Sequence, residues 1–270
     1  MEQIIINDEN IEVGTGYSSK GNQMKWKSED WWYKADQMGY EGMSETVTSH
    51  LLKLSSVKYD IVYEPVIIIY KNKKLTGCRS RNFLGEREEI ITLEHLFRQY
   101  TGMSLAKELA HIAEIKDRIA YLVEQVINFT GLENFGEYLT KMLEMDAFFL
   151  NEDRHTNNIA VIYQLDEDKF KLCPYFDMGL SLFSDIKEDF LLGRSFEECR
   201  KNIVAKPFSR DFDAQLDAAN ELYGSFLKFS VKKEDMIREV DRWDFLYPKE
   251  AVDRVKETLR YQAGKYRYML

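Results

Sequence analysis

Apolar and polar residues follow different patterns in the two parts of the chain. In the first hundred residues, short runs of aromatic and β-branched residues predict strands over 31–35, 63–70 and 75–84. Apolar side chains at helical spacing predict a helix over 40–54, between the first two strands. The polar residues 72–74 predict a turn before the third strand.

From residue 104 the pattern becomes helical. Apolar residues at three- and four-residue steps predict one long amphipathic helix over 104–130, which Gly131 ends. Asn134, with Glu137 three residues later, resembles a capping box, and residues 138–149 predict a second, almost wholly buried helix.

This order of elements predicts an α+β fold with two lobes. A β-rich N-lobe over 1–85 precedes a mainly α-helical C-lobe over 86–270. A cleft between two such lobes is a natural place to bind a nucleotide.

Composition narrows the class of protein. Charged residues make up 31% and the formal net charge is -9, which is typical of a soluble globular protein. An acidic balance argues against a sequence-independent nucleic-acid binder and against docking on an anionic membrane. The longest aliphatic run, 66–69, is too short to cross a bilayer.

The expected compartment is the cytoplasm. The N-terminus shows no basic segment followed by an apolar core, so no secretion signal is predicted. Cys78, Cys173 and Cys199 are odd in number and widely spaced, which favours buried, reduced thiols.

The strongest chemical signal is an Asp-x-His-x-x-Asn motif from Asp153 to Asn158. A predicted hairpin of strands over 159–163 and 170–174 follows it, and an Asp-x-Gly motif starts at Asp177. Phosphoryl transfer needs a carboxylate to orient the attacking hydroxyl, and an amide plus a second carboxylate for magnesium. A kinase supplies these groups at such spacing, so the motifs predict a phosphotransferase.

Each residue of these motifs has a proposed role and an alternative. Asp153 would accept a hydrogen bond from the substrate hydroxyl, or it would merely cap a turn. Asn158 and Asp177 would supply a neutral and a charged oxygen to Mg²⁺. We expect His155 to fix the loop by hydrogen bonding, and a zinc site is disfavoured because no second His or Cys lies at ligand spacing.

Lys34 lies within the first predicted strand. In a kinase it would contact the nucleotide phosphates and pair with a carboxylate on the following helix. Glu45 suits this role, and Glu41 is the alternative one turn earlier on the same face. The other reading is a strand lysine that extends to solvent.

A glycine-rich segment over 14–25 precedes Lys34. Its glycines permit close approach to phosphate oxygens, although Ser19 stands where the third glycine of Gly-x-Gly-x-x-Gly would be. The Walker-A spacing also lacks its Lys-Ser/Thr, and a plain flexible hairpin is the alternative. The candidate ATP-binding residues are Gly14, Gly16, Ser18, Ser19, Gly21, Gln23, Lys34 and Glu45.

The order of these motifs resembles that of the HipA-like serine/threonine kinases, whose fold is related to the phosphatidylinositol kinases. The similarity spans 13–184 and includes Gly-x-Gln-x-Lys from Gly21. The resemblance implies that Asp153 is the catalytic aspartate, that Asn158 and Asp177 bind magnesium, and that Lys34 binds ATP. The implied cofactors are ATP and Mg²⁺.

The resemblance also implies a biological setting. The chain is similar to compact members that lack the additional N-terminal subdomain of the longer toxins. A toxin of a toxin–antitoxin system would have an antitoxin protein as partner and a protein substrate with a Ser or Thr acceptor. Family members autophosphorylate a serine of the glycine-rich loop, and Ser18 and Ser19 are the candidates here, beside Lys20.

Two other functions fit the same motifs. A lipid or small-molecule kinase would use the same catalytic parts. A nucleotide-binding regulatory protein without turnover would bind ATP but transfer no phosphate, and the intact Lys34, Asp153, Asn158 and Asp177 argue against that loss.

Overall fold

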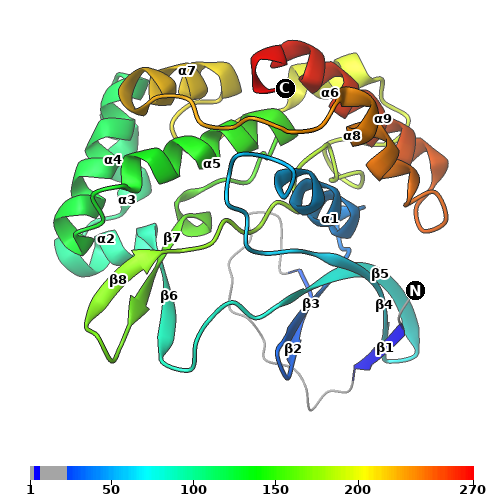
Figure 1. Ribbon diagram of the computed structural model, residues 1–270, viewed down its shortest axis with the longest axis horizontal. Helices are drawn as coiled ribbons and strands as arrows, with labels where there is room; N and C mark the ends of the chain where they lie inside the picture. The colour runs from blue at the N-terminus through cyan, green and yellow to red at the C-terminus, as the bar shows by residue number, and fades with distance from the viewer. Residues whose placement is uncertain (1–2, 7–22) are drawn as a thin grey trace. The chain divides into compact units, whose positions relative to one another are not determined.

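The structure is a computed structural model that describes residues 3–6 and 23–270 (Figure 1). Contacts divide the chain into two units whose segments are interleaved in sequence. The first unit comprises Met1–Asn82, Asp177–Ile203 and Lys228–Leu270, and the second comprises Phe83–Phe176 and Val204–Leu227. The lobe boundaries predicted from the sequence, 1–85 and 86–270, stay a prediction.

Part of the predicted glycine-rich loop lies outside the described residues. The predicted site residues affected are Gly14, Gly16, Ser18, Ser19 and Gly21. Their roles in ATP binding and autophosphorylation therefore remain predictions.

The first unit contains a five-stranded sheet in the order β1-β4-β5-β3-β2. The strands are β1 (Gln3–Ile6), β2 (Lys25–Ser28), β3 (Trp31–Ala35), β4 (Glu64–Tyr70) and β5 (Lys73–Arg81). β1 runs parallel to β4, and the other neighbours are antiparallel. Alternate residues on one face, such as Val66 and Ile68, form a buried cluster with Trp26 and Tyr33, as a half-buried strand requires.

Helix α1 (Glu41–Leu52) packs against β3, β4 and β5 and is buried on nearly every side. Small residues allow this close approach, because a Cβ on Gly42 would lie 2.7 Å from the carbonyl carbon of Gly77. Gly77 itself passes close to β3, since a Cβ there would lie 2.1 Å from the Lys34 carbonyl oxygen. The backbone around Lys34 is therefore fixed by tight packing.

The other helices of the first unit come from its two later segments. They are α6 (Phe196–Asn202), α8 (Lys233–Asp241), α9 (Lys249–Lys265) and the 3₁₀ turn Arg267–Met269. α8 packs on both α1 and α9. The C-terminal part of the chain thus completes the core around α1.

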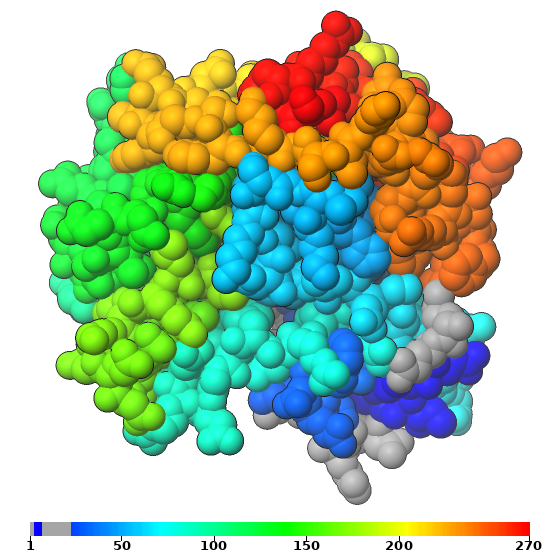
Figure 2. All heavy atoms as spheres, in the orientation of Figure 1, coloured from blue at the N-terminus to red at the C-terminus, as the bar shows by residue number. Residues whose placement is uncertain are grey.

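The second unit combines a three-stranded antiparallel sheet, ordered β6-β7-β8, with a group of helices. The strands are β6 (Glu88–Thr92), β7 (Ala160–Gln164) and β8 (Lys169–Leu172). The helices are α2 (Leu93–Thr101), α3 (Leu105–His111), α4 (Ile115–Thr130), α5 (Phe135–Phe149) and α7 (Phe212–Tyr223). α5 is buried along its length and packs against α4 and α7. α7 is partly exposed and lies at the molecular surface (Figure 2).

The prediction of one long helix over 104–130 is wrong, because the chain breaks into α3 and α4. Residues 112–114 leave the helical conformation, and the Arg118 guanidinium donates to the carbonyls of Ile112 and Ala113 that the break exposes. The predicted capping box is also not formed, since the Asn134 side chain makes no capping hydrogen bond at the start of α5. α5 is instead stabilised by burial.

Candidate functional site

In the first unit, Lys34 on β3 is held between two carboxylates. Its Nζ donates to Glu45 Oε1 at 2.6 Å and to Asp177 Oδ1 at 3.1 Å. Only 12% of the lysine side chain is exposed, so the lysine does not simply extend to solvent. Burial lowers the pKa of Lys34, but the surrounding groups, Glu45 foremost, outweigh this effect and hold the pKa well above its usual value.

Glu45 connects Lys34 to the chain that follows Asp177. Its second oxygen, Oε2, accepts a hydrogen bond from the Met178 amide at 3.1 Å. The carboxylate is almost completely buried, and both of its oxygens are hydrogen-bonded. Glu45 therefore fixes the lysine and the segment after Asp177 together.

Glu41, the alternative partner of Lys34, has a different structural role. Its carboxylate accepts hydrogen bonds from the amides of Gln37, Met38 and Gly39 at 2.5–3.0 Å. These bonds hold the turn that leads from β3 into α1. The sequence favoured Glu45 and left Glu41 as the alternative, because both lie on the same face of the helix.

A second carboxylate, Asp36, shares this turn. It accepts hydrogen bonds from the Gly42 amide at 2.6 Å and from the Tyr247 hydroxyl at 2.9 Å. Burial, reinforced by the nearby Glu41 charge, raises the pKa of Asp36 to about 7. Asp36 therefore holds a proton more tightly in the folded protein than in the unfolded chain.

We expect Asp36 to make stability depend on pH. Because the folded pKa is about 7 and the usual value is near 3.8, its contribution is complete below about pH 4 and is lost as the pH rises to 7. Asp36→Asn removes this titration, so the variant should gain stability relative to the wild type over that interval. Urea unfolding at several pH values measures the difference, and two parallel curves would contradict the assignment.

Asp177 occupies an unusual backbone conformation, with φ of 62°. Aspartate and asparagine adopt this left-handed region more readily than most residues, and such conformations are common at functional sites. Around it, the Ser44 hydroxyl donates to the carbonyls of Met178 and Ser181, and the Tyr40 hydroxyl donates to that of Leu182. α1 thus anchors the backbone that presents the Asp177 carboxylate, which is one-quarter exposed.

Gln23 is a candidate ATP-binding residue at the end of the glycine-rich segment, and it lies just before β2. Its side-chain amide donates to the Ala35 carbonyl at 3.0 Å. This bond ties the end of the glycine-rich segment to the strand that carries Lys34.

In the second unit, the loop between α5 and β7 is built on a buried ion pair. The Arg154 guanidinium bonds both oxygens of Asp146, at 2.9 and 3.1 Å, and neither side chain is more than 1% exposed. Arg154 also donates to the carbonyls of Asn158 and Phe176 at 2.7 and 3.1 Å. One arginine therefore fixes both ends of the β7–β8 hairpin.

This ion pair predicts a large loss of stability when it is broken. Arg154→Ala leaves the Asp146 carboxylate buried without its partner, which costs about 3–5 kcal/mol. Urea unfolding at pH 7 tests the value. Adding Asp146→Leu to the variant should recover part of the loss, because the double variant no longer buries an unpaired charge; no recovery would contradict this explanation.

The loop brings Asp153 and Asn158 together. Asn158 Nδ2 donates to the Asp153 carbonyl at 2.9 Å and lies 3.5 Å from Asp153 Oδ2. His155 Nε2 lies 3.8 Å from the same Oδ2, beyond hydrogen-bond distance. The Asp153 backbone amide donates to Asn151 Oδ1 at 3.2 Å, so the loop position of Asp153 is itself fixed.

Two features of this loop were not predicted from the sequence. One is the Asp146–Arg154 ion pair. The sequence offered a hint of it, because a charged residue within a predicted buried helix needs a partner and an arginine follows the motif aspartate. The other is Lys206, whose Nζ lies 3.2 Å from Asp153 Oδ1. Nothing in the sequence links Lys206 to the loop, because 53 positions separate the two residues.

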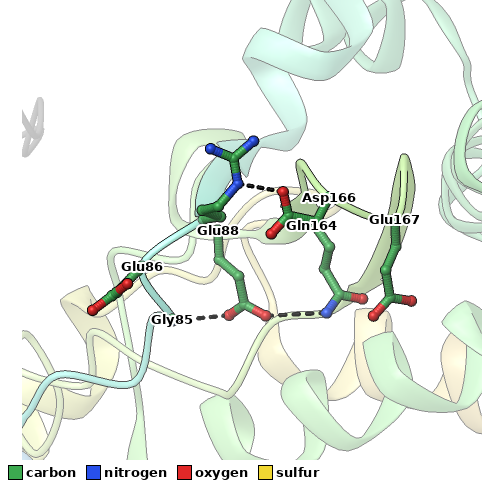
Figure 3. A pocket seen from close by; sticks show the side chains of 7 residues that line it. Gly85, Glu86, Glu88, Gln164, Asp166 and Glu167 are labelled. Atoms are coloured by element: carbon green, nitrogen blue, oxygen red, sulfur yellow. Dashed lines mark hydrogen bonds and ion pairs between the residues drawn. The ribbon is translucent and has the colours of Figure 1, made fainter.

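A surface pocket also lies in the second unit, at the end of β6 and β7 (Figure 3). It is lined by Gly85, Glu86, Arg87, Glu88, Gln164, Asp166 and Glu167. Several of these groups pair with one another. Arg87 pairs with Asp166, and Glu88 accepts hydrogen bonds from Gln164 and from Lys171, which is not a lining residue. None of the predicted site residues within 23–270 lines this pocket.

Comparison with known proteins identifies the fold. No protein-family model and no curated protein matches the chain. Among solved structures, the chain is similar to a proinflammatory kinase of Helicobacter pylori, CtkA, with a TM-score of 0.62, 17% identity and 90% of each chain covered. The predicted α+β, kinase-like fold is confirmed.

No helix among residues 3–6 and 23–270 is both long enough and apolar enough to span a membrane.

Proposed function

We propose that this protein is an ATP- and magnesium-dependent kinase that phosphorylates serine or threonine in a protein substrate. The observation that carries the proposal is the buried Lys34, paired with Glu45 and Asp177 in the first unit. A buried lysine with this pairing is suited to a nucleotide phosphate, because the ligand can replace the Asp177 contact with its own negative charge. The kinase-like fold supports the same reading.

Each proposed residue has a defined task. Lys34 binds the ATP phosphates, and Glu45 orients its ammonium group. Asp153 accepts the hydrogen bond of the acceptor hydroxyl and takes its proton as the oxygen–phosphorus bond forms and the bond to the ADP oxygen breaks. Arg154 touches neither reactant and acts by positioning Asp153.

The available donors fit a magnesium ion. Asp177 and Asn158 offer a carboxylate and an amide oxygen, which are the hard ligands that Mg²⁺ prefers. The left-handed backbone at Asp177 and the buttressed Asn158 would present them in fixed orientations. When bound, the ion would neutralise phosphate charge.

The biological setting is also part of the proposal. On the HipA-like resemblance, the acceptor is a Ser or Thr of another protein, and the chain acts in the cytoplasm as a toxin controlled by an antitoxin protein. Phosphorylation of Ser18 or Ser19 would add negative charge to the glycine-rich loop and reduce ATP binding.

A transfer assay tests the proposal. The wild type and the Lys34→Met variant are incubated with labelled ATP and cell lysate, and the acceptors are located by phosphosite mass spectrometry. We expect label on Ser or Thr with the wild type and none above background with the variant. Label in the lipid fraction would instead favour a lipid kinase, and nucleotide binding without transfer would favour a regulatory protein.

A further inference from the structure

The positive charge of Lys206 lies next to the carboxylate of the proposed catalytic aspartate, Asp153. Its Nζ lies 3.2 Å from Asp153 Oδ1, and both residues belong to the second unit. The Asp153 side chain is 7% exposed, whereas that of Lys206 is 36% exposed. The lysine therefore reaches a nearly buried carboxylate from its solvent side.

The chain fixes the backbone of Lys206 with several interactions. The Ala205 amide donates to the Arg210 carbonyl, which closes a turn over 205–210. The Lys206 carbonyl accepts a hydrogen bond from Gln215, a fully buried residue of α7, at 3.2 Å. The backbone of Lys206 is therefore held by a hydrogen-bonded turn that places the side chain next to Asp153.

Phe208 strengthens the same turn. Its side chain is fully buried, and its carbonyl accepts a hydrogen bond from Arg118 at 2.7 Å. Because Arg118 also holds the break between α3 and α4, the turn is joined to the helical core of the second unit. These interactions hold the backbone on both sides of Lys206.

We propose that Lys206 is a catalytic residue that binds the phosphoryl group during transfer. This inference rests on the proposed kinase function. Asp153 contacts the acceptor oxygen, and that oxygen bonds to the transferred phosphorus, so a cation beside Asp153 lies near the phosphoryl oxygens. In the state described, Asp153 takes the place of the phosphoryl group as the partner of Lys206.

The charge balance of the step is simple. The acceptor oxygen forms a bond to the γ-phosphorus, the bond to the ADP oxygen breaks, and Asp153 receives the hydroxyl proton. Lys206 stays protonated and moves no proton, and its positive charge stabilises the phosphoryl oxygens as negative charge spreads over them. Lys34 differs from Lys206 in its pairing, because its ammonium group contacts two carboxylates, Glu45 and Asp177.

The test compares Lys206→Met and Lys206→Arg with a matched control, Lys116→Met. Lys116 also belongs to the second unit and pairs with a single carboxylate, Glu221, so its loss removes a lysine–carboxylate ion pair that does not involve Asp153. The measurements are kcat and KM for ATP, the affinities for MgADP and for MgADP with aluminium fluoride, which mimics the transferring phosphoryl group, and the unfolding temperature.

We expect Lys206→Met to lower kcat roughly 10²–10³-fold, the usual loss for a donor that stabilises charge in the transition state. The KM for ATP and the MgADP affinity should stay at the wild-type values, while the extra affinity gained with aluminium fluoride disappears. Lys206→Arg should retain part of the wild-type kcat and part of the extra affinity gained with aluminium fluoride. Lys116→Met should match the wild type in every measurement.

Each of four outcomes would overturn the inference. An unchanged kcat in Lys206→Met, with an active wild type, removes Lys206 from the mechanism and leaves the kinase function intact. If Lys206→Met weakens the binding of MgADP equally with and without aluminium fluoride, Lys206 has a structural role. The same conclusion follows if kcat falls only in proportion to a lower unfolding temperature in both Lys206→Met and Lys206→Arg. A wild type that transfers no phosphate overturns the proposed function and this inference with it.

Discussion

Asp153→Asn is expected to reduce phosphate transfer roughly 10²–10⁴-fold, the usual contribution of a positioned acid or base. Asparagine has the same size but cannot take the hydroxyl proton. Folding and ATP binding should be preserved, because the loop is held mainly by Arg154 and by the Asp153 backbone. Initial rates of transfer, ATP binding and thermal unfolding are measured on the same preparation.

Asp166→Asn is the matched control for this experiment. Asp166 also lies in the second unit and pairs with a cation, Arg87, but it lies on the β7–β8 turn, outside the motif. We expect the control to be as active as the wild type. Near-normal transfer by Asp153→Asn would remove this aspartate from the mechanism, and a large loss in Asp166→Asn would show that charge removal alone is harmful.

Asp177→Asn is expected to weaken magnesium-dependent ATP binding and turnover together. The substitution removes a full negative charge that would face a divalent cation, and such hard ligands dominate magnesium binding. Asn158→Ala should have a milder effect, because it removes a neutral oxygen. Titrating magnesium against ATP binding in the wild type and both variants measures this order.

The backbone provides a control for Asp177. Asp168, in the turn between β7 and β8, also has a left-handed φ of 51°. Asparagine tolerates this region as aspartate does, so Asp177→Asn and Asp168→Asn should fold equally well. Identical magnesium curves for the wild type, Asp177→Asn and Asn158→Ala would contradict the proposed metal ligands.

Much of the local structure could be predicted, because local patterns decide it. β3, β4 and α1 form where aromatic, β-branched and helically spaced apolar residues predicted them. The strand β6 (Glu88–Thr92) was not predicted, because it is stabilised by pairing with β7, which lies some seventy residues later.

The candidate site could be predicted only where its residues share a motif. Asp153 and Asn158 were recognised by spacing, and Lys34 by its strand and the helix that follows. Asp146 is only eight positions from Arg154, but it lies on a buried helix outside the motif. Lys206 contacts the loop from 53 positions away, and patterns in a single sequence do not encode such a pairing. The break at 112–114 was missed for the same reason, because Arg118 stabilises it through a contact with Phe208 as well as with the exposed carbonyls.

The interleaved segments of the two units have a consequence for folding during synthesis. The second unit has all its residues once Leu227 has emerged, whereas the first unit still lacks Lys228–Leu270, which supplies the helix α8 that packs on α1. Because a chain emerges from the ribosome N-terminal end first, the second unit can finish folding earlier. The Lys34 region, although made first, is then the last to gain its full core.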